Sequence, residues 1–358
     1  MAAGKLAGLD KGPGFAIIKT EKDCETAIGG QSAFHCPFPL RDQQSAMTLP
    51  LLDLDFDCRL LSPARLPAFK GSTLRGAFGH ALKSVACALK RQDCASCLLA
   101  GNCAYSLIFA TEKLDASRLS ARPHPYVLNP PATDQLQYRE GDSLSFNLVL
   151  LGPATQFLPH VVCAVEAMGQ KGIGSGTTEG SGRFALHRVT MGEQPAQVLY
   201  TEEDRMLRPP DNPPCLHLEA GAPGPAGELG LGLLTPLRLK DQNSLQSALP
   251  FSLLIRAALR RVSALEEHYG SGRPALDYHA LVMQAGAVES VQADTRWQEI
   301  KRYSNRQKRE MLLGGMVGRL RFRGHISVFL PLLRYAEAVN LGKQTVFGLG
   351  RIRIVEPA

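Results

Sequence analysis

The residues with the clearest potential for chemistry form a glycine-rich segment near the C-terminus, Gly342-Lys-Gln-Thr-Val-Phe-Gly-Leu-Gly350. Glycine lets the backbone approach a partner without an intervening side chain and reaches φ values that are closed to other residues. Exposed amide N–H groups in such a turn form a concavity that suits anions, and Lys343 adds a positive charge. The segment predicts contact with a phosphate group through Gly342, Gly348 and Gly350. A tight turn without a ligand is the alternative.

A concentrated positive charge lies just before this segment. The chain of 358 residues has a net charge of +7, and the whole excess falls between residues 301 and 323, where eight basic residues stand against the single acid Glu310. Such a concentration favours a polyanionic partner, most simply nucleic acid. A solvated basic face without a partner is the alternative. The basic residues are Lys301, Arg302, Arg306, Lys308, Arg309, Arg319, Arg321 and Arg323.

Cysteines form a third pattern, because four of the nine crowd into residues 87–103 as Cys87, Cys94, Cys97 and Cys103. Cys94 and Cys97 have the two-residue spacing that tetrahedral zinc sites favour, and the other two can complete the set. We find no export signal, and clustered cysteines then indicate metal rather than disulfides. The sequence therefore predicts a structural zinc ion that pins a long loop. Free thiols are the alternative, because no second Cys-x-x-Cys pair exists.

The sequence gives no sign of a membrane or of nucleotide-driven chemistry. No run of about 18 apolar residues is present, and the first ten residues lack the apolar core of a signal peptide. Neither a Walker loop nor a dinucleotide fingerprint occurs, because the Gly172-Ile-Gly-Ser-Gly176 segment lacks the required lysine and following helix. We expect a cytoplasmic protein without a membrane partner.

The predicted helices and strands that position these residues occur in a similar order in the two halves of the chain. Residues 1–46 lack periodicity, and we expect a flexible N-terminal extension there. Alternating and helical patterns in the first half predict a strand over 51–60, a helix over 70–89, a strand over 143–151, a helix over 157–168 and a strand over 183–189. The second half repeats this order, with a strand over 229–240, a helix over 250–269, strands over 288–304 and 308–323, a helix over 326–339 and a last strand over 351–355.

Two tandem β-α-β-β-α-β units explain the repeat most economically. Each would be a ferredoxin-like sandwich of the α+β class, with helices on one face of an antiparallel sheet. We assign residues 47–191 to an N-terminal domain with the cysteine loop 87–103. Residues 229–358 form the C-terminal domain with the glycine-rich loop 342–350. Prolines and glycines dominate residues 192–228, which we expect to be a linker.

Several motifs together resemble one family of RNA-processing enzymes. They are the run Leu66-Pro-Ala-Phe-Lys-Gly-Ser-Thr-Leu-Arg-Gly-Ala-Phe-Gly79, the segment Arg302-Tyr-Ser-Asn-Arg-Gln307, the cysteine cluster followed by Ala104-Tyr105, and the closing loop 342–350. With two ferredoxin-like units, they look like the CRISPR RNA-processing endoribonucleases of the repeat-associated mysterious protein superfamily. The resemblance spans nearly everything from Met47 to Val355, and the closing loop is its most specific part.

The resemblance implies a substrate, a reaction and partners. Such enzymes bind the repeat of a long CRISPR transcript, usually a short hairpin, and cut it once without a metal ion. The 2′-hydroxyl attacks the adjacent phosphate and leaves a 2′,3′-cyclic phosphate and a 5′-hydroxyl. Many remain bound to the mature guide. The expected partners are therefore CRISPR repeat RNA, mature crRNA and other subunits of a CRISPR effector complex.

This reaction needs a proton acceptor near the 2′-oxygen, a proton donor near the 5′-oxygen and positive charge near the phosphate. The family often places a histidine on or near the first helix, so we expect His80 to act as general base or acid; a surface histidine is the alternative. Lys343 and Tyr303 are further catalytic candidates, with His325 and His187 in reserve. The expected RNA-binding residues are Arg302, Arg306, Lys308, Arg309, Arg319, Arg321, Gly342, Gly348 and Gly350.

A second hypothesis is that the protein binds the RNA without cutting it. The protein would be a catalytically inactive subunit that holds the hairpin of a guide RNA inside a CRISPR effector complex. The sequence does not fix the acid and base, so binding without cleavage would favour this hypothesis. A backbone or capping subunit of the same superfamily is a third interpretation, which the two glycine-rich loops disfavour.

Overall fold

The computed structural model describes residues 15–16, 47–90, 93–111, 122–192, 195–219, 221–241, 244–304 and 308–355. Most of the expected extension 1–46 lies outside the described residues. Its described part is β1 (Phe15–Ala16), which pairs with β9 (Met206–Leu207). In the described part of the chain, no helix is long and apolar enough to cross a membrane.

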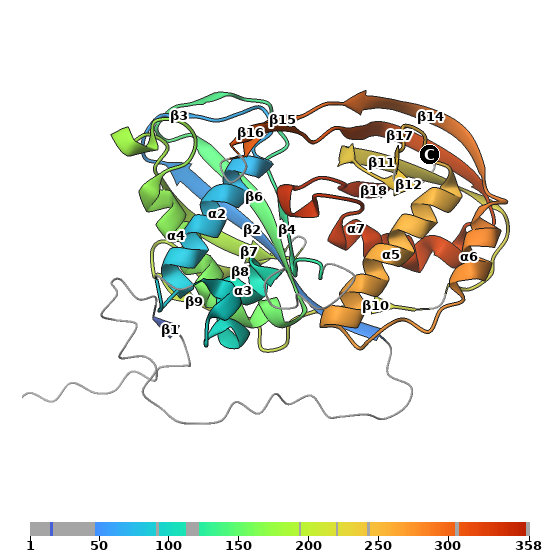
Figure 1. The fold of residues 1–358 in the computed structure, drawn as a ribbon, viewed down its shortest axis with the longest axis horizontal. Coiled ribbons are helices and arrows are strands. Elements are labelled where there is room, and N and C mark those ends of the chain that lie inside the picture. The colour runs from blue at the N-terminus through green and yellow to red at the C-terminus, as the bar shows by residue number, and fades with distance from the viewer. Residues whose placement is uncertain are drawn as a thin grey trace, which may run out of the picture.

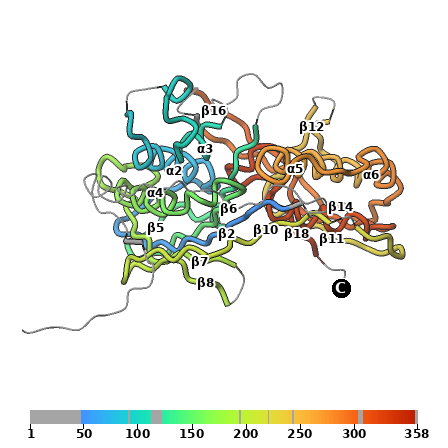
Figure 2. The backbone as a smooth tube through the Cα atoms, turned by 90° about the horizontal axis from the view of Figure 1, so that it is seen from below, coloured from blue at the N-terminus to red at the C-terminus, as the bar shows by residue number. Residues whose placement is uncertain are grey.

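The described chain folds into two lobes that lie side by side, each with helices on one face of an antiparallel sheet (Figures 1 and 2). The N-terminal lobe contains α2 (Gly71–Ala86) and α4 (Leu158–Lys171) over strands in the order β4-β6-β2-β7-β8, with β10 also paired to β2. These strands are β2 (Met47–Leu60), β4 (Tyr126–Asn129), β6 (Ser143–Leu151), β7 (Phe184–Met191), β8 (Gln197–Thr201) and β10 (Cys215–Leu218).

The C-terminal lobe repeats this arrangement. Its sheet has the order β14-β17-β11-β18, covered by α5 (Phe251–Tyr269) and α7 (Leu330–Val339), and α6 (Tyr278–Ala285) packs on α5. The strands are β11 (Gly227–Leu237), β14 (Glu289–Gln298), β17 (Gly315–Gly324) and β18 (Ile352–Val355). Shorter elements are α3 (Ala104–Ile108), β3 (Ala64–Arg65), β5 (Gln137–Tyr138), β12 (Lys240–Asp241) and β13 (Ser244–Leu245).

The predicted α+β class with antiparallel sheets is confirmed, and in both lobes the strand order agrees with a β-α-β-β-α-β unit. In the N-terminal sheet, the structure differs from the sequence prediction in two places. Strand β4 was not predicted, because its four residues lie between prolines at positions 125 and 130. Residues 192–228, predicted to be a linker, contain β8, β9 and β10, and β8 and β10 add to the N-terminal sheet at β7 and β2.

Alternation along β2 separates the core from the open face of the N-terminal sheet. Leu52, Leu54 and Phe56 are buried beneath the helices, whereas Asp53 and Asp55 point to the opposite, solvated face. This is the pattern expected for a strand with one wet face. The open faces of the two sheets are therefore the sides left available for ligands.

A hairpin of β15 (Lys301–Ser304) and β16 (Arg309–Leu312) projects from the C-terminal sheet toward the N-terminal lobe (Figure 1). The sequence predicted two continuous strands here, but each is interrupted, so that β14 and β17 stay in the sheet. Ile300 and Leu313 at the hairpin root are buried against Leu349 of the closing loop and Phe69 before α2. This small apolar cluster fixes the hairpin over the junction of the lobes.

A second contact joins the lobes on the helix side. The Tyr269 hydroxyl donates a hydrogen bond to the Pro123 carbonyl, and the Arg122 guanidinium lies 4.8 Å from the Tyr269 ring centre. Gly152 has φ +56°, and a Cβ atom there would lie 2.6 Å from the Tyr269 Cβ. Only glycine therefore allows this approach of α5 to the N-terminal lobe.

We expect Gly152→Ala to lower the free energy of unfolding more than Gly141→Ala, measured by urea unfolding. Both glycines have positive φ, which costs an alanine about 1–2 kcal/mol. Nothing lies within 4 Å of a Cβ atom at Gly141. The clash with Tyr269 should therefore cost Gly152→Ala a further ~1–3 kcal/mol. Equal losses in the two variants would show that this interlobe contact does not hold the lobes together.

Candidate functional site

Three segments meet at the junction of the lobes: the first turn of α2, the single turn η7 (Thr345–Phe347) in the closing loop, and the β15–β16 hairpin. The Phe347 ring centre lies 5.1 Å from the Arg75 guanidinium carbon and 4.6 Å from that of Arg302. We call Arg75, Arg302, Phe347 and Ser72 the arginine cluster. It joins one side chain of the hairpin to helix α2 through an aromatic ring of the closing loop.

The positive charge of the arginine cluster is not neutralised by any carboxylate among the described residues. The Arg302 Nη1 donates to Ser72 Oγ at 3.4 Å and its Nη2 approaches Met311 Sδ at 3.2 Å, while Arg75 stacks on Phe109 at 4.1 Å. The Nε atoms of both arginines are buried without a hydrogen-bond partner in the described structure. Burial and then the charge of Arg75 lower the pKa of Arg302. Two like charges held together in this way favour an anion between them.

The start of α2 adds to this positive field. Its first turn contains no acidic residue, and the residue before it, Lys70, makes no capping hydrogen bond with its side chain. The unpaired amides and the helix dipole therefore favour negative charge at Ser72. Lys70 is buried, with its Nζ donating to the carbonyls of Pro67, Ala68 and Thr133 at 3.3, 3.1 and 2.9 Å. Burial lowers the pKa of Lys70.

The glycines of the closing loop have a packing role in the structure. Gly348 has φ +85°, and a Cβ atom there would lie 2.2 Å from Pro130 Cδ of the N-terminal lobe. Gly350 has φ +72°, and its Cβ atom would lie 1.7 Å from the Leu341 carbonyl oxygen. The loop thus packs by its backbone against the other lobe and against itself. A direct contact of these glycines with RNA stays a prediction.

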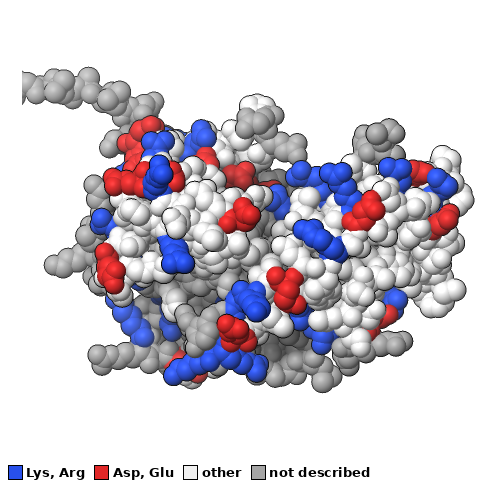
Figure 3. All heavy atoms as spheres, turned by 90° about the horizontal axis from the view of Figure 1, so that it is seen from above, with Lys and Arg blue, Asp and Glu red and all other residues white. Residues whose placement is uncertain are grey.

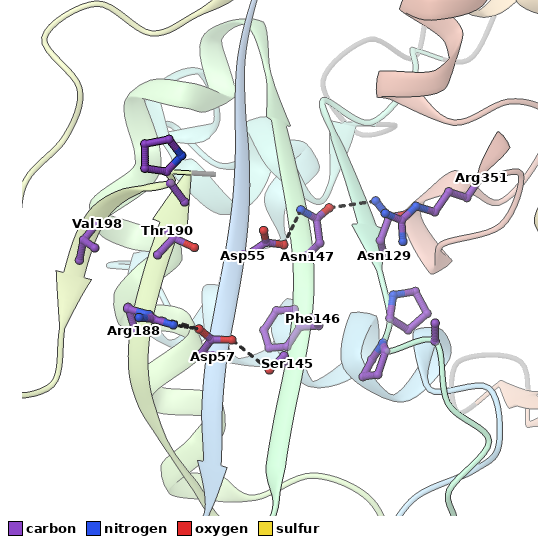
Figure 4. Close-up of a pocket in the computed structure, with 15 residues that line it drawn as sticks. Asp55, Asp57, Asn129, Ser145, Phe146, Asn147, Arg188, Thr190, Val198 and Arg351 are labelled. Atoms are coloured by element: carbon purple, nitrogen blue, oxygen red, sulfur yellow. Dashed lines mark hydrogen bonds and ion pairs between the residues drawn. The ribbon is translucent and has the colours of Figure 1, made fainter. Parts of the chain in front are cut away.

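Asparagine side chains tie the closing loop to the N-terminal sheet. The buried Asn340 donates from Nδ2 to the Leu349 carbonyl at 3.3 Å and to Asn129 Oδ1 at 3.0 Å. Asn129 donates to Asn147 Oδ1 at 2.9 Å, and Asn147 donates to Asp55 at 3.0 Å (Figure 4). This chain of hydrogen bonds crosses the lobe junction. It positions the loop that carries Phe347.

Two cavities adjoin this chain and share its Asn129. One of about 500 Å³ lies on the open face of the N-terminal sheet, where Asp55, Asp57 and Arg188 point into it and Arg351 reaches in from the other lobe (Figure 4). The other, of about 670 Å³, lies between the lobes beside the hairpin root. We call it the interlobe groove.

The structure does not bring all the predicted catalytic residues together. His80 is exposed on α2, eight residues after Ser72 and therefore about 12 Å farther along the helix axis. Lys343 is exposed at the start of the closing loop, where its amide donates to the Arg238 carbonyl. Among described contacts, none joins His80 or Lys343 to the arginine cluster. Tyr303 lies on β15, but its side chain lies outside the described residues, as does Arg306.

The other predicted residues are divided between two surfaces. Lys308 and Arg309 lie at the turn of the hairpin, whereas Arg319 and Arg321 are exposed on β17 and face away from the helices. His325 follows β17 at the end opposite the hairpin, about 30 Å along the strand from Gly315. His187, on β7, lies 3.5 Å from Glu202. Among the described contacts, neither histidine touches the arginine cluster.

The four cysteines that the sequence predicts to bind zinc do not form a metal-binding group in the described residues. Cys87, Cys94, Cys97 and Cys103 are partly buried free thiols, and the described residues contain no group of three or more His, Cys, Asp or Glu side chains that could hold a metal ion. The Cys103 thiol instead approaches the Ala86 carbonyl at 3.8 Å. Zinc binding stays a prediction from the spacing alone.

Sequence reasoning missed Arg75, Phe347 and Asn340 as site residues. Arg75 and Phe347 both lie within motifs that carry the family resemblance, so their presence there was an available signal. Their pairing was not visible, because 272 positions separate them and the contact requires both lobes. Asn340 lies just before the closing loop and carries no motif of its own.

Comparisons with known proteins agree with the arrangement of the lobes. A search of curated proteins finds no match. Residues 49–212 match a family model described only as an N-terminal domain, and residues 231–352 match the model of the CRISPR-associated endoribonuclease Cas6. The second match includes the hairpin and the whole closing loop.

Solved structures show the same fold. A Cas6 product complex from Thermus thermophilus is 16% identical with a TM-score of 0.51, over 86% of this chain and 99% of that chain. A chain of a partial Cas6-RT-Cas1–Cas2 complex is 13% identical with a TM-score of 0.54, over 87% of this chain. The chain spans only 46% of the length of that larger protein. At these identities the likeness establishes the fold.

We expect inorganic sulfate to raise the melting temperature of the wild type more than that of Arg302→Gln. An anion that binds only the folded protein stabilises it, and removal of one guanidinium weakens the site. Arg188→Gln is the matched control, because Arg188 is already paired with Asp57 at 3.0 Å. General salt effects should act on all three proteins alike. The same increase in all three would contradict an anion site at the arginine cluster.

Proposed function

Because this chain belongs to the CRISPR-associated Cas6 endoribonuclease family, we propose that it binds the repeat of a CRISPR transcript and cuts the transcript into guide RNAs. The observation that carries the proposal is the uncompensated positive charge of the arginine cluster, formed where the Cas6-like lobe meets the start of α2. A phosphodiester is the anion that such an enzyme must hold.

The proposed reaction is a transesterification within the RNA. The 2′-oxygen forms a bond to the adjacent phosphorus while the bond from phosphorus to the 5′-oxygen breaks, which leaves a 2′,3′-cyclic phosphate and a 5′-hydroxyl. A base takes the proton of the 2′-hydroxyl, and an acid gives a proton to the 5′-oxygen. Negative charge grows on the remaining phosphate oxygens in the transition state. Arg75, Arg302 and the Ser72 hydroxyl would stabilise that charge.

His80 is the proposed proton carrier. Its imidazole is exposed on the same helix as Ser72 and Arg75, so bound RNA can reach it. About 12 Å along the helix axis separates it from Ser72, and a bound nucleotide has to span that distance for both to act on one phosphate. Lys343 and Tyr303 remain candidates for a second proton transfer or for a phosphate contact. We further propose that the reaction proceeds without a metal ion.

A guide-holding subunit without catalysis is the second candidate function. It is favoured by one observation: no histidine among the described residues contacts the arginine cluster. The similar solved structures include a Cas6 product complex and an assembly of Cas6 with Cas1 and Cas2. On either hypothesis, the proposed partners are repeat RNA, mature crRNA and other CRISPR proteins.

We expect the purified protein to cut the repeat RNA encoded beside its own gene at one position in the presence of EDTA. A 2′-deoxy substitution at the scissile nucleotide should abolish the cut, because it removes the attacking oxygen. Arg75→Ala and Arg302→Ala should each lower the single-turnover rate about 10²-fold or more, as loss of a charge-stabilising donor does. A denaturing gel measures each rate. Arg188→Ala, at the paired arginine, is the control and should cut at the wild-type rate.

The same assay separates the proposals. Wild-type cleavage by His80→Ala would remove His80 from the mechanism while leaving the arginine cluster in place. Cleavage that is lost in EDTA and restored by a divalent cation would contradict the metal-free reaction. Tight binding of the repeat with no cut under any condition would assign the protein to the guide-holding class. Wild-type rates in both arginine variants would contradict the site itself.

A further inference from the structure

We propose that a cross-strand row on the open face of the C-terminal sheet, Arg319, Gly232 and Arg353, holds the phosphodiester backbone of single-stranded RNA that extends beyond the hairpin. This inference rests on the proposed function and extends it to a second surface, on the opposite side of the sheet from helices α5 and α7. We call the row the arginine slot.

The strand register builds the arginine slot. Gly232 on the central strand β11 pairs with Arg319 on β17 and with Arg353 on β18. Neighbouring strands lie about 4.8 Å apart, so the two arginine backbones are roughly 10 Å apart with a glycine between them. Both arginine side chains are exposed, while their strand neighbours Leu320 and Ile352 are buried in the core. Gly232 therefore places no side chain of its own between the two arginines, and Leu234 Cδ2 is the nearest side-chain atom of another β11 residue, 3.7 Å from where a Cβ atom at Gly232 would lie.

Neither arginine of the arginine slot forms a salt bridge among the described residues, although one carboxylate lies on the neighbouring strand. Asp294 is the cross-strand neighbour of Arg319 on β14, but it accepts its hydrogen bond from the Gln292 side chain. Neither Arg319 nor Arg353 has a carboxylate partner among the described residues. Arg323, two positions along the same strand, differs because its Nε and Nη2 donate to Glu228 at 2.9 and 2.6 Å. Lys and Arg side chains stand along this lobe and in the region between the lobes (Figure 3).

The arginine slot is connected to the proposed cleavage site. Arg353 also lines the interlobe groove of about 670 Å³, together with Lys301 at the hairpin root and Arg351. Phe69, just before α2, also lines this groove. A groove of this volume has the size of pockets that hold small ligands, so it suits a short piece of single strand. RNA that leaves the arginine cluster would thus meet cations along its whole path.

The chemistry of the arginine slot favours backbone contact over base recognition. The open-face positions of β11, β17 and β18 in the described chain carry arginine, glycine, valine, leucine and glutamate, with no aromatic side chain. Bases of single-stranded RNA are usually held by aromatic stacking, and phosphates by arginine and lysine. The arginine slot should therefore strengthen binding of any sequence and supply no sequence specificity.

The test compares two uncleavable RNAs that carry 2′-deoxy at the scissile nucleotide: the repeat hairpin alone, and the hairpin with a single-stranded extension. Binding of each is measured by fluorescence anisotropy over a salt series. We expect the Arg319→Ala/Arg353→Ala double variant to bind the extended RNA more weakly, with the slope of log K against log salt reduced by about 1.4, as for two phosphate contacts on a single strand. Binding of the hairpin alone should not change. Arg323→Ala, whose charge Glu228 already neutralises, is the matched control and should behave as the wild type on both RNAs.

Gly232→Glu is a second, independent variant. A Cβ atom at Gly232 would have its nearest neighbours at 3.7 Å, so a side chain fits without strain and places a carboxylate between the two arginines. It should weaken binding of the extended RNA and leave binding of the hairpin alone unaffected.

Unchanged binding of the extended RNA in both variants would overturn the inference, and would leave a free phosphate ion as the remaining ligand of this chemistry. Equal losses on both RNAs, or an equal loss in Arg323→Ala, would overturn it as well. A wild type that binds neither RNA would reject the proposed function and this inference together, whereas hairpin binding with no gain from the extension would reject the inference alone.

Discussion

Direct backbone packing between the closing loop and the N-terminal lobe is the contact on which the site depends. A Cβ atom at Gly71 would lie 1.9 Å from the Phe347 carbonyl oxygen, and one at Gly348 would lie 2.2 Å from Pro130 Cδ. No side chain fits at either position, so the two backbones approach as closely as atoms allow. Phe347 is thereby fixed against the first turn of α2. The hairpin follows, because its root packs on Leu349 of the same loop.

This packing explains how the protein holds charges that repel one another. Arg75 and Arg302 come from different lobes, and both contact the Phe347 ring. Cation–π contacts of this kind contribute about 0.5–2 kcal/mol each, which offsets part of the cost of two half-buried charges without a counterion. The two charges leave a positive potential at the N-terminal end of α2, where the helix dipole is also positive. An anion that enters this site relieves the repulsion, so the free protein is prepared for phosphate before RNA binds. Apolar and backbone packing thus hold the two guanidinium groups in place before the anion binds, which is electrostatic preorganisation.

Much of the fold could be predicted from the sequence, because each long element carries its own period. The alternation of 143–151 predicted β6 with its observed bounds, and the apolar stripe of 250–269 predicted α5 within one residue. Short elements such as β4 and β10 were not predicted, since four residues carry too little pattern and their pairing with β6 and β2 is set by tertiary contacts.

The site was predicted only in part. Charge and glycine content identified Arg302 and the closing loop, whereas the contact of Arg75 with Phe347 depends on how two lobes dock. The cysteine spacing predicted zinc, but local spacing does not determine whether four thiols converge, so zinc binding stays a prediction.

The most direct test of the central claim is an experimental structure of the protein bound to repeat RNA with 2′-deoxy at the scissile nucleotide. The measurement is the position of the scissile phosphate relative to the two guanidinium groups that flank Phe347. We expect its non-bridging oxygens to accept hydrogen bonds from Arg75 or Arg302, with the Ser72 hydroxyl and the first amides of α2 close by. A scissile phosphate held elsewhere, with the arginine cluster in contact with no phosphate at all, would contradict it.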